Sequence, residues 1–141
     1  MSQIFDEKCY TRELKYALWQ MKRQGITPIL TTELLTPSEF FSLLEKVSPV
    51  WYEYARTQFT VKPVEINRCN SITNAIERRI PLPIPYITPE AIPNIFPVDG
   101  CHRMYVCEKL FEPNTKFPVL ILTALKISDG KEITYAKNRY N

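Results

Sequence analysis

The sequence predicts a single α+β domain, with a helical N-terminal part over residues 1–58 and an α+β core over residues 59–141. Three observations lead to this class. Of the 141 residues, 45% are hydrophobic and 12% are aromatic, which is enough apolar surface to build a core. In the first part, apolar residues recur every three or four positions, as they do along one face of a helix. From residue 59 onward, short segments of strand character alternate with helical ones.

The first helical segment covers residues 9–24. Its apolar residues follow the i, i+3, i+4, i+7 spacing of one helix face: Leu14, Ala17, Leu18 and Met21. Gly25 follows the basic residues Lys22 and Arg23, a pattern typical of a helix C-terminus, because glycine ends helices and cations suit their negative end.

A second helix carries a specific start signal. Thr36 is its expected N-cap, Pro37 suits the first helical position, and Glu39 completes a capping box. Pro49 either ends this helix or starts another that runs to about Phe59. The N-terminal part therefore contains two or three helices.

The expected core has the order β-α-β-β-α-β and ends in a β-hairpin. Strand character is found at residues 59–66, 81–87, 95–98 and 117–127. Helical character is found at residues 71–79 and 101–111, with one further helical turn at residues 88–90. The dipeptide Asp129-Gly130 is a common signal for a tight hairpin turn, after which the last strand returns.

The stretch VDGCHR, residues 98–103, passes from strand directly into helix and carries the only histidine of the chain. Glycine at position 100 allows a sharp turn and lets a ligand approach the backbone. The first amides of a helix lack internal partners and favour an anion. His102 and Arg103 would oppose the helix dipole there unless an anion compensates them, and an arginine fork suits phosphate. The turn therefore predicts a phosphate site formed by Gly100, Cys101, His102 and Arg103.

Two side chains of this turn suit catalysis. Cys101 lies in the same positive field, which lowers the pKa of a thiol and makes the thiolate available as a nucleophile. Asp99 is suited to be an N-cap, a metal ligand or a proton acceptor. A purely structural interpretation stands beside this one, with Asp99 as N-cap, Gly100 as turn residue, Cys101 as a small buried side chain and Arg103 as a surface charge.

With its flanking elements, the turn resembles the core of the ParB/sulfiredoxin superfamily over about residues 61–122. That superfamily carries a Gly-x-x-Arg or Gly-x-His-Arg turn at a helix start and binds nucleotide phosphates with it. Residues 100–103 also spell the Gly-Cys-His-Arg motif of sulfiredoxins. Asp99-Gly100 followed by His102-Arg103 equally resembles the motif of ParB-like free serine kinases.

This resemblance implies an adenine nucleotide ligand such as ATP, with phosphoryl transfer as the chemistry and Mg²⁺ as the companion of the phosphates. In a sulfiredoxin-like reaction, Cys101 would be the nucleophile and Arg103 would help to hold ATP. In a kinase-like reaction, Asp99 would activate a hydroxyl acceptor. The chain departs from the family pattern, because prolines replace the Gly-rich stretch before the motif and no helix-turn-helix signal follows residue 122. The N-terminal helices belong to neither pattern.

Residues outside the turn are weaker candidates. Glu65, at the end of the first expected core strand, is either a base facing the same cleft or a solvated strand residue. Arg68 could extend the anion site, as could Arg78 and Arg79, although the C-terminal end of a helix also explains the last two.

Four aromatic residues have two interpretations. They either form a stacking surface for bases or for a partner, or pack between helices in the core. These residues are Trp19, Trp51, Tyr52 and Tyr54.

Composition narrows the class of protein further. The net charge is +3 and no stretch gathers five or six like charges, so an anionic ligand or nucleic acid is permitted but not required. No apolar run reaches the roughly 18 residues of a membrane span, and the polar N-terminus lacks the pattern of a secretory signal. We therefore expect a cytoplasmic protein with no membrane partner. The four cysteines form no C-x-x-C pair, so no metal site is expected from them.

Two alternatives to a nucleotide enzyme remain open. One is a non-catalytic regulatory or accessory protein that contacts nucleic acid or a protein partner. The other is a ParB-like DNA-binding or nuclease module, for which binding would depend steeply on salt. The weakly basic tail with Lys137 and Arg139 either contacts nucleic acid or is simply solvated.

Overall fold

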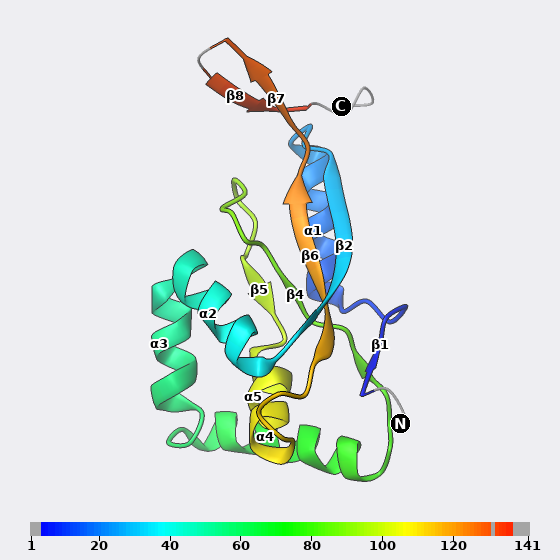
Figure 1. Ribbon diagram of the computed structural model, residues 1–141, viewed down its shortest axis with the longest axis vertical. Coiled ribbons are helices and arrows are strands. Elements are labelled where there is room, and N and C mark those ends of the chain that lie inside the picture. Colours follow the sequence, from blue (N-terminus) through cyan, green and yellow to red (C-terminus); the bar gives the residue numbers. More distant parts are fainter. Residues whose placement is uncertain (1–3, 131, 137–141) are drawn as a thin grey trace.

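The computed structural model describes residues 4–130 and 132–136 and has the α+β class that the sequence predicts (Figure 1). Its helices are α1 (Arg12–Arg23), α2 (Pro37–Val47), α3 (Pro49–Gln58), α4 (Pro63–Glu77) and α5 (Cys101–Leu110). Its strands are β1 (Phe5–Asp6), β2 (Pro28–Leu35), β3 (Leu82–Pro83), β4 (Tyr86–Ile87), β5 (Val98–Asp99), β6 (Phe117–Ala124), β7 (Lys126–Asp129) and β8 (Glu132–Tyr135). The basic tail residues Lys137 and Arg139 lie outside the described residues.

A four-stranded mixed sheet in the order β2-β6-β4-β5 forms the centre of the molecule. Strand β2 runs antiparallel to β6 along its whole length, from the Pro28–Ala124 pair to the Leu35–Phe117 pair. Strand β6 is parallel to β4, and β4 is antiparallel to β5. A short parallel pair, β1 with β3, lies apart from this sheet. The apolar β6 is a central strand, and its residues from Phe117 to Leu122 are all buried.

Strand β2 lies in the part of the chain for which the sequence predicts only helices. The interpretation of residues 1–58 as purely helical is therefore wrong for residues 28–35. The β-branched residues of this segment suit a strand, but its half-exposed face gives only a weak alternation of apolar and polar residues. Because β2 pairs with β6, the two parts of the chain share one sheet.

The first strand expected in the core is instead the start of helix α4. Pro63 occupies its first turn, where the missing amide hydrogen would have no helical partner anyway. In the segment expected as a separate helix at residues 71–79, residues 71–77 continue the same helix, which ends at its C-cap Arg78. Residues 59–66 therefore do not supply the opening strand of the predicted β-α-β-β-α-β order.

The start of α1 has a cap that the sequence analysis does not predict, because Thr11 Oγ1 accepts from the Leu14 amide at 3.2 Å. Thr36 and Glu39 form the expected capping box at the start of α2. Pro49 starts a further helix, α3, rather than only ending α2.

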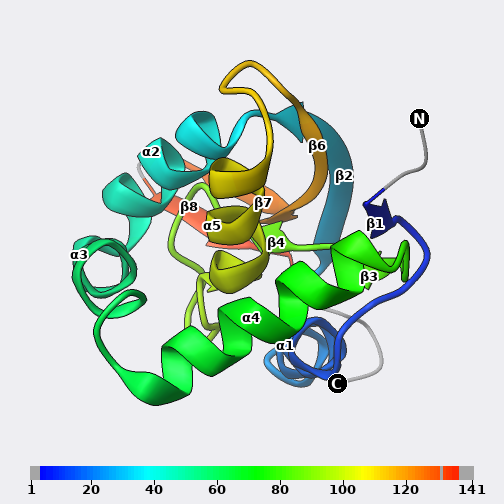
Figure 2. The ribbon, with the colours of Figure 1, turned by 90° about the horizontal axis from the view of Figure 1, so that it is seen from below.

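The helices lie on both sides of the sheet. Figure 2 shows α1 on one side and α2, α3 and α5 on the other. Helix α4 crosses the lower end of the molecule in Figure 1, next to α5. Large, fully buried side chains come from α1, α2 and α5 and from β1, β4 and β6; they include Phe5, Leu14, Met21, Phe40, Leu44, Tyr86, Met104 and Leu122.

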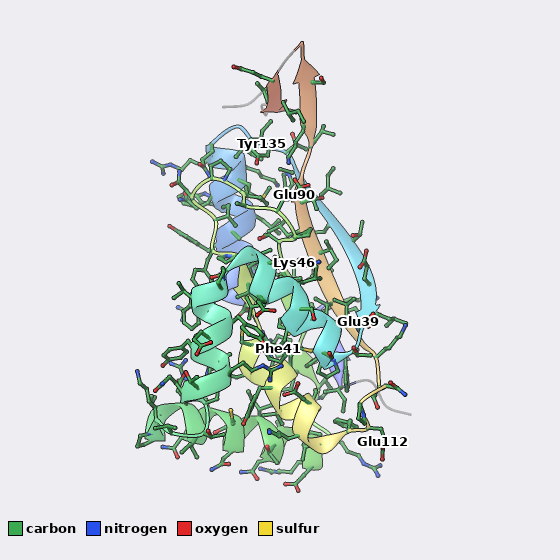
Figure 3. All side chains as sticks on the ribbon, turned by 60° about the vertical axis from the view of Figure 1, so that its left-hand side comes forward. Glu39, Phe41, Lys46, Glu90, Glu112 and Tyr135 are labelled. Carbon is green, nitrogen blue, oxygen red and sulfur yellow. The ribbon has the colours of Figure 1, made fainter. Side chains whose placement is uncertain are left out.

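The predicted hairpin is present as β7 and β8, which extend from the top of the molecule in Figure 1. Gly130 lies in its turn with a left-handed φ of 63°. The base of the hairpin is fixed to residues 90–91, because Lys126 pairs with Glu90 and the Tyr135 hydroxyl donates to the Ala91 carbonyl at 3.1 Å. Figure 3 shows Tyr135 and Glu90 close together at this junction. Residues 88–90 form no helical turn, in contrast to the prediction.

Candidate functional site

The turn around Gly100 has the predicted strand-turn-helix geometry. Gly100 follows β5 directly and is the N-cap of α5, with a φ of 110°. A Cβ atom at this position would lie 2.5 Å from the Pro85 Cβ, well inside contact distance. Backbone conformation and available space therefore both demand glycine here.

Arg103 is buried and holds three segments of the chain together. Its Nη1 donates to the Pro83 carbonyl at 2.7 Å, and its Nη2 donates to Asp99 Oδ2 at 3.1 Å. The Thr11 hydroxyl donates to the same carboxylate oxygen at 2.6 Å. The interpretation of Arg103 as a surface charge is therefore wrong, since the residue is only 8% exposed. Asp99 is not the N-cap of α5 but the acceptor that joins Arg103 to the start of α1.

His102 is held by a buried carboxylate and an aromatic ring. Its Nε2 lies 3.2 Å from Glu65 Oε2, and its ring stacks on Phe59 with centroids 4.1 Å apart. Glu65 lies in the first turn of α4 and is 4% exposed, so it is neither at a strand end nor solvated. Burial lowers the pKa of His102, and the bond to Glu65 opposes this only in part.

This contact also selects the tautomer of His102. An ionised carboxylate only accepts hydrogen bonds, so Nε2 carries the proton and Nδ1 is left as an acceptor. Within residues 4–130 and 132–136, no group forms a hydrogen bond with Nδ1, and no side-chain nitrogen or oxygen is both buried and unpartnered. Nδ1 is therefore available to a ligand.

A pocket of about 340 Å³ opens at the N-terminus of α5. We call it the anion pocket, and it is lined by Thr11, Arg68, Ser71, Ile72, Asp99, Gly100, His102 and Arg103. The pocket holds the guanidinium groups of Arg68 and Arg103 but only one carboxylate, that of Asp99. Arg103 and Thr11 already bind this carboxylate. The side chain of Arg68 forms a long ion pair with Glu65, with Nη1 4.0 Å from Oε1, and is 63% exposed, so its guanidinium has surface left for a ligand. Together with the positive end of α5, these groups favour an anion.

Cys101 does not fit the activated thiol that the sequence predicts. The residue is 7% exposed and does not line the anion pocket. Burial, reinforced by the negative charge of Asp99, raises the pKa of its thiol to about 12. The expected lowering by Arg103 and the helix start is therefore wrong in direction, because desolvation outweighs both.

The described residues contain no group of three or more His, Cys, Asp and Glu side chains that could hold a metal ion. In the anion pocket, Asp99 is the only carboxylate, and its Oδ2 is occupied by Arg103 and Thr11. Mg²⁺ commonly binds through one or two carboxylates together with the phosphates of a ligand. The residues present therefore fit Mg²⁺ only as an ion that would arrive with a phosphate ligand, with Asp99 as the one pocket carboxylate that could hold it.

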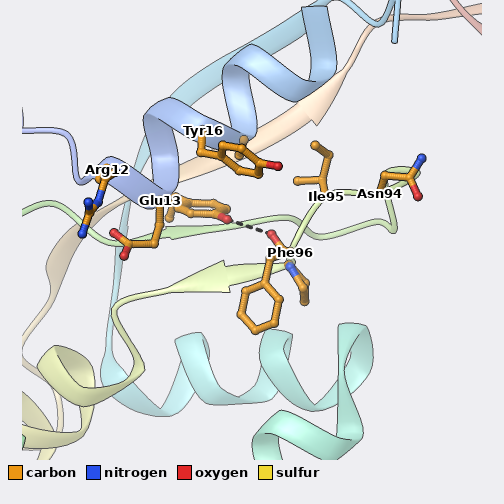
Figure 4. A pocket seen from close by; sticks show the side chains of 9 residues that line it. Arg12, Glu13, Tyr16, Asn94, Ile95 and Phe96 are labelled. Carbon is orange, nitrogen blue, oxygen red and sulfur yellow. Dashed lines mark hydrogen bonds between the residues drawn. The ribbon is translucent and has the colours of Figure 1, made fainter. Parts of the chain in front are cut away.

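A second pocket, of about 670 Å³, lies between α1 and residues 94–97 (Figure 4). We call it the apolar pocket, and it is lined by Arg12, Glu13, Tyr16, Ala17, Tyr86, Asn94, Ile95, Phe96 and Pro97. Tyr86 is buried at its wall, and its hydroxyl donates to the Phe96 carbonyl at 2.8 Å. The sequence analysis does not predict this pocket, because its two walls meet only through the tertiary structure.

The aromatic candidates have different roles. Trp51, Tyr52 and Tyr54 are partly buried and pack against the core. Trp19 is 52% exposed and lies beside Tyr16, which is 59% exposed, with ring centroids 5.8 Å apart. Only Trp19 of the four therefore belongs to an exposed aromatic surface. Tyr16 could have been suspected from the sequence, since it lies off the apolar face of its helix.

A scan of protein-family models, a search of the curated proteins and a search of the solved structures each found no match to this chain. The ParB/sulfiredoxin-like resemblance therefore stays a prediction that rests on the turn motif. Within the part of the chain that the structure describes, no helix has the length and apolar character needed to cross a membrane.

Proposed function

We propose that this chain is a nucleotide- or phosphate-binding protein and that its ligand occupies the anion pocket. One observation carries the proposal. Gly100, His102 and Arg103 at the start of α5, where the first amides have no helical partner, line the same pocket as Arg68, and Gly100 cannot be replaced without strain.

The pocket suits phosphate in its charge and in its donors. The amides of the first turn of α5 precede the first helical bond, from the Met104 amide to the Gly100 carbonyl, and so have no partner within the helix. Ser71 adds a hydroxyl and Arg68 an exposed guanidinium. The negative charge of Asp99 is balanced by Arg103, so it does not cancel the attraction for an anion.

A catalytic extension of this proposal is phosphoryl transfer from ATP to a hydroxyl acceptor. Here the base is His102 rather than Asp99 or Cys101, because Glu65 fixes its ring and Nδ1 is left free. The acceptor hydroxyl gives its proton to Nδ1, its oxygen bonds to the terminal phosphorus, and ADP leaves. Mg²⁺ bound to the phosphates would offset the charge of the transferring group.

A non-catalytic alternative is also favoured by a specific observation. Tyr16 and Trp19 are exposed side by side on α1, with the Arg23 guanidinium 5.3 Å from the Trp19 ring centroid. Exposed rings beside arginines are suited to stack bases of single-stranded nucleic acid. Such binding would weaken steeply with salt, whereas binding of a mononucleotide at the anion pocket would not.

Calorimetry with pyrophosphate and with ATP, each with and without Mg²⁺, tests the proposal. Arg68→Ala should weaken binding of both ligands by about 1.5 kcal/mol or more, the usual size of a hydrogen bond to a charged group. Arg78→Ala is the matched control, because Arg78 is an exposed arginine at the far end of the same helix and does not line the pocket. If neither ligand binds the parent protein, or if the two variants behave alike, the proposal is wrong.

A further inference from the structure

We infer that the free edge of β2 pairs with the same edge of a second copy of this chain. The two copies are then related by a two-fold axis, and their central sheets join into one continuous sheet. The partner is this protein itself, and the inference does not depend on the proposed ligand site.

Strand β2 is the outer strand of the central sheet. The strand order β2-β6-β4-β5 places β6 on one side of it, and no strand within residues 4–130 and 132–136 pairs with its other side. Figure 2 shows β2 at the outer margin of the molecule, beside β6. All eight residues of β2 are paired with β6, so the free edge is as long as the strand. Such an edge is a ready template for another strand.

The backbone groups of Leu30, Thr32 and Leu34 face this free edge. In an antiparallel pair, only alternate residues exchange hydrogen bonds with the partner strand. Leu120 lies opposite Thr32, but its amide donates to the Pro85 carbonyl, on the far side of β6, at 2.9 Å. Thr32 and its alternate neighbours therefore direct their amides and carbonyls away from β6. In the part of the chain that the structure describes, no other hydrogen bond reaches these groups.

The side chains of β2 match those of a second copy in one register. A two-fold axis at Thr32 places this residue opposite its own copy and places Leu30 opposite Leu34 of the second copy. Each of these pairs exchanges two backbone hydrogen bonds, and their side chains lie on one face of the joined sheet. Leu34 is 61% exposed, so the pairing covers the most exposed large apolar side chain of the strand.

The charge and the proline of β2 select the same register. Glu33 is the only charged residue of the strand, and an axis at Thr32 places it opposite the neutral Thr31 of the second copy. An axis at Glu33 would bring two carboxylates directly opposite each other, which destabilises a strand pair. An axis at Thr31 would place Pro28, which has no amide hydrogen, in a position that has to donate.

Strand β2 lacks features that commonly protect an edge strand from pairing. It contains no lysine, its register with β6 runs without a bulge, and its only proline is its first residue, Pro28. The edge is therefore open to a partner strand. A strand pair buries less surface than the roughly 1,600 Å² of a standard interface, so we expect a dimer that dissociates on dilution.

Sedimentation velocity at increasing protein concentration tests the inference. The parent protein should pass from monomer to dimer as its concentration rises. Thr32→Pro removes an outward amide and should abolish the dimer, while the fold remains because β6 does not use that amide. Leu34→Lys should weaken the dimer about tenfold, since both copies lose an apolar cross-strand contact. Val61→Lys is the matched control, because Val61 is equally exposed, at 64%, but lies outside the sheet.

A cysteine cross-link tests the register. The background for it is Cys9→Ser, which removes the exposed native thiol. Thr32→Cys then places two thiols directly opposite each other, where Cα atoms about 5.5 Å apart suit a disulfide. Thr31→Cys is the control, because its two copies are offset along the strands and should cross-link far less. Mild oxidation with diamide followed by non-reducing electrophoresis measures both.

The inference is overturned if the parent stays monomeric at every concentration. A dimer that survives Thr32→Pro, or equal cross-linking at positions 31 and 32, would also overturn it, since the contact would then lie at another surface or in another register. If Thr32→Pro unfolds, Leu34→Lys and the cross-link decide the question. None of these outcomes bears on the anion pocket, which is tested with pyrophosphate and ATP.

Discussion

Gly100 and His102, two residues apart, meet different physical demands. Gly100 must adopt a left-handed φ and leave space for Pro85. His102 must enter a buried contact with Glu65 while keeping one ring nitrogen for a ligand. The demand on Gly100 is steric and that on His102 is electrostatic. A substitution at Gly100 therefore tests stability, and one at His102 tests how stability depends on pH.

Gly100→Ala should destabilise the protein more than Gly130→Ala does. Both glycines have a positive φ, which costs a non-glycine residue about 1–2 kcal/mol. A Cβ at Gly100 would also meet Pro85, whereas nothing lies within 4 Å of a Cβ at Gly130. We therefore expect a loss of about 3–5 kcal/mol for Gly100→Ala against about 1–2 kcal/mol for the control, measured by urea unfolding. Equal losses would show that the turn can relax away from Pro85.

The free energy of unfolding should fall as the pH drops below 6.5, because His102 has a lowered pKa in the folded state. Between that lowered pKa and the ordinary value of 6.5, the unfolded chain binds more protons than the folded one, so stability rises with pH across this window. His102 is the only histidine of the chain. Urea unfolding at about pH 5.5 and about pH 7.5 should show the dependence in the parent and a much flatter profile in His102→Gln. An equal slope in both proteins would assign the dependence to other groups.

At the scale of elements, the start of α1 connects a helix to the sheet. Thr11 accepts from the Leu14 amide as the N-cap of α1 and donates to Asp99 at the end of β5. One hydroxyl therefore satisfies a helix end and fixes the acceptor of Arg103. Thr11 also lines the anion pocket, so the position of α1 and the shape of this pocket both depend on it.

Thr11→Val should lower the free energy of unfolding by about 1–3 kcal/mol, because it removes the helix cap and leaves Asp99 with one donor fewer. Thr11→Ser keeps the hydroxyl and should cost less than about 1 kcal/mol. Urea unfolding of the two variants gives the comparison. If valine is tolerated as well as serine, the hydroxyl does not connect α1 to the sheet in the way described.

At the scale of the whole molecule, what could be predicted from the sequence depended on how local the deciding interactions are. The capping box of Thr36 and Glu39 lies within four residues and was predictable. The turn at Gly100 was also predictable, since the glycine lies where the apolar pattern changes from that of a strand to that of a helix. Pro63 suits either an edge strand or a first helical turn, and only the packing of α4 against α5 decides between them. The pKa of Cys101 could not be predicted, because burial is a property of the folded chain.

The pairing of β2 with β6 has a consequence for synthesis. Their paired residues are 82 to 96 positions apart in the chain. On a ribosome, residues 28–35 leave the exit tunnel long before residues 117–124 exist, so the central sheet cannot close until the chain has been made to residue 124. Contacts between such distant segments carry a large loop-closure cost before they stabilise anything, which slows folding. The nascent chain can form its capped helices and the β1–β3 and β4–β5 pairs early, but the four-stranded sheet must wait for β6.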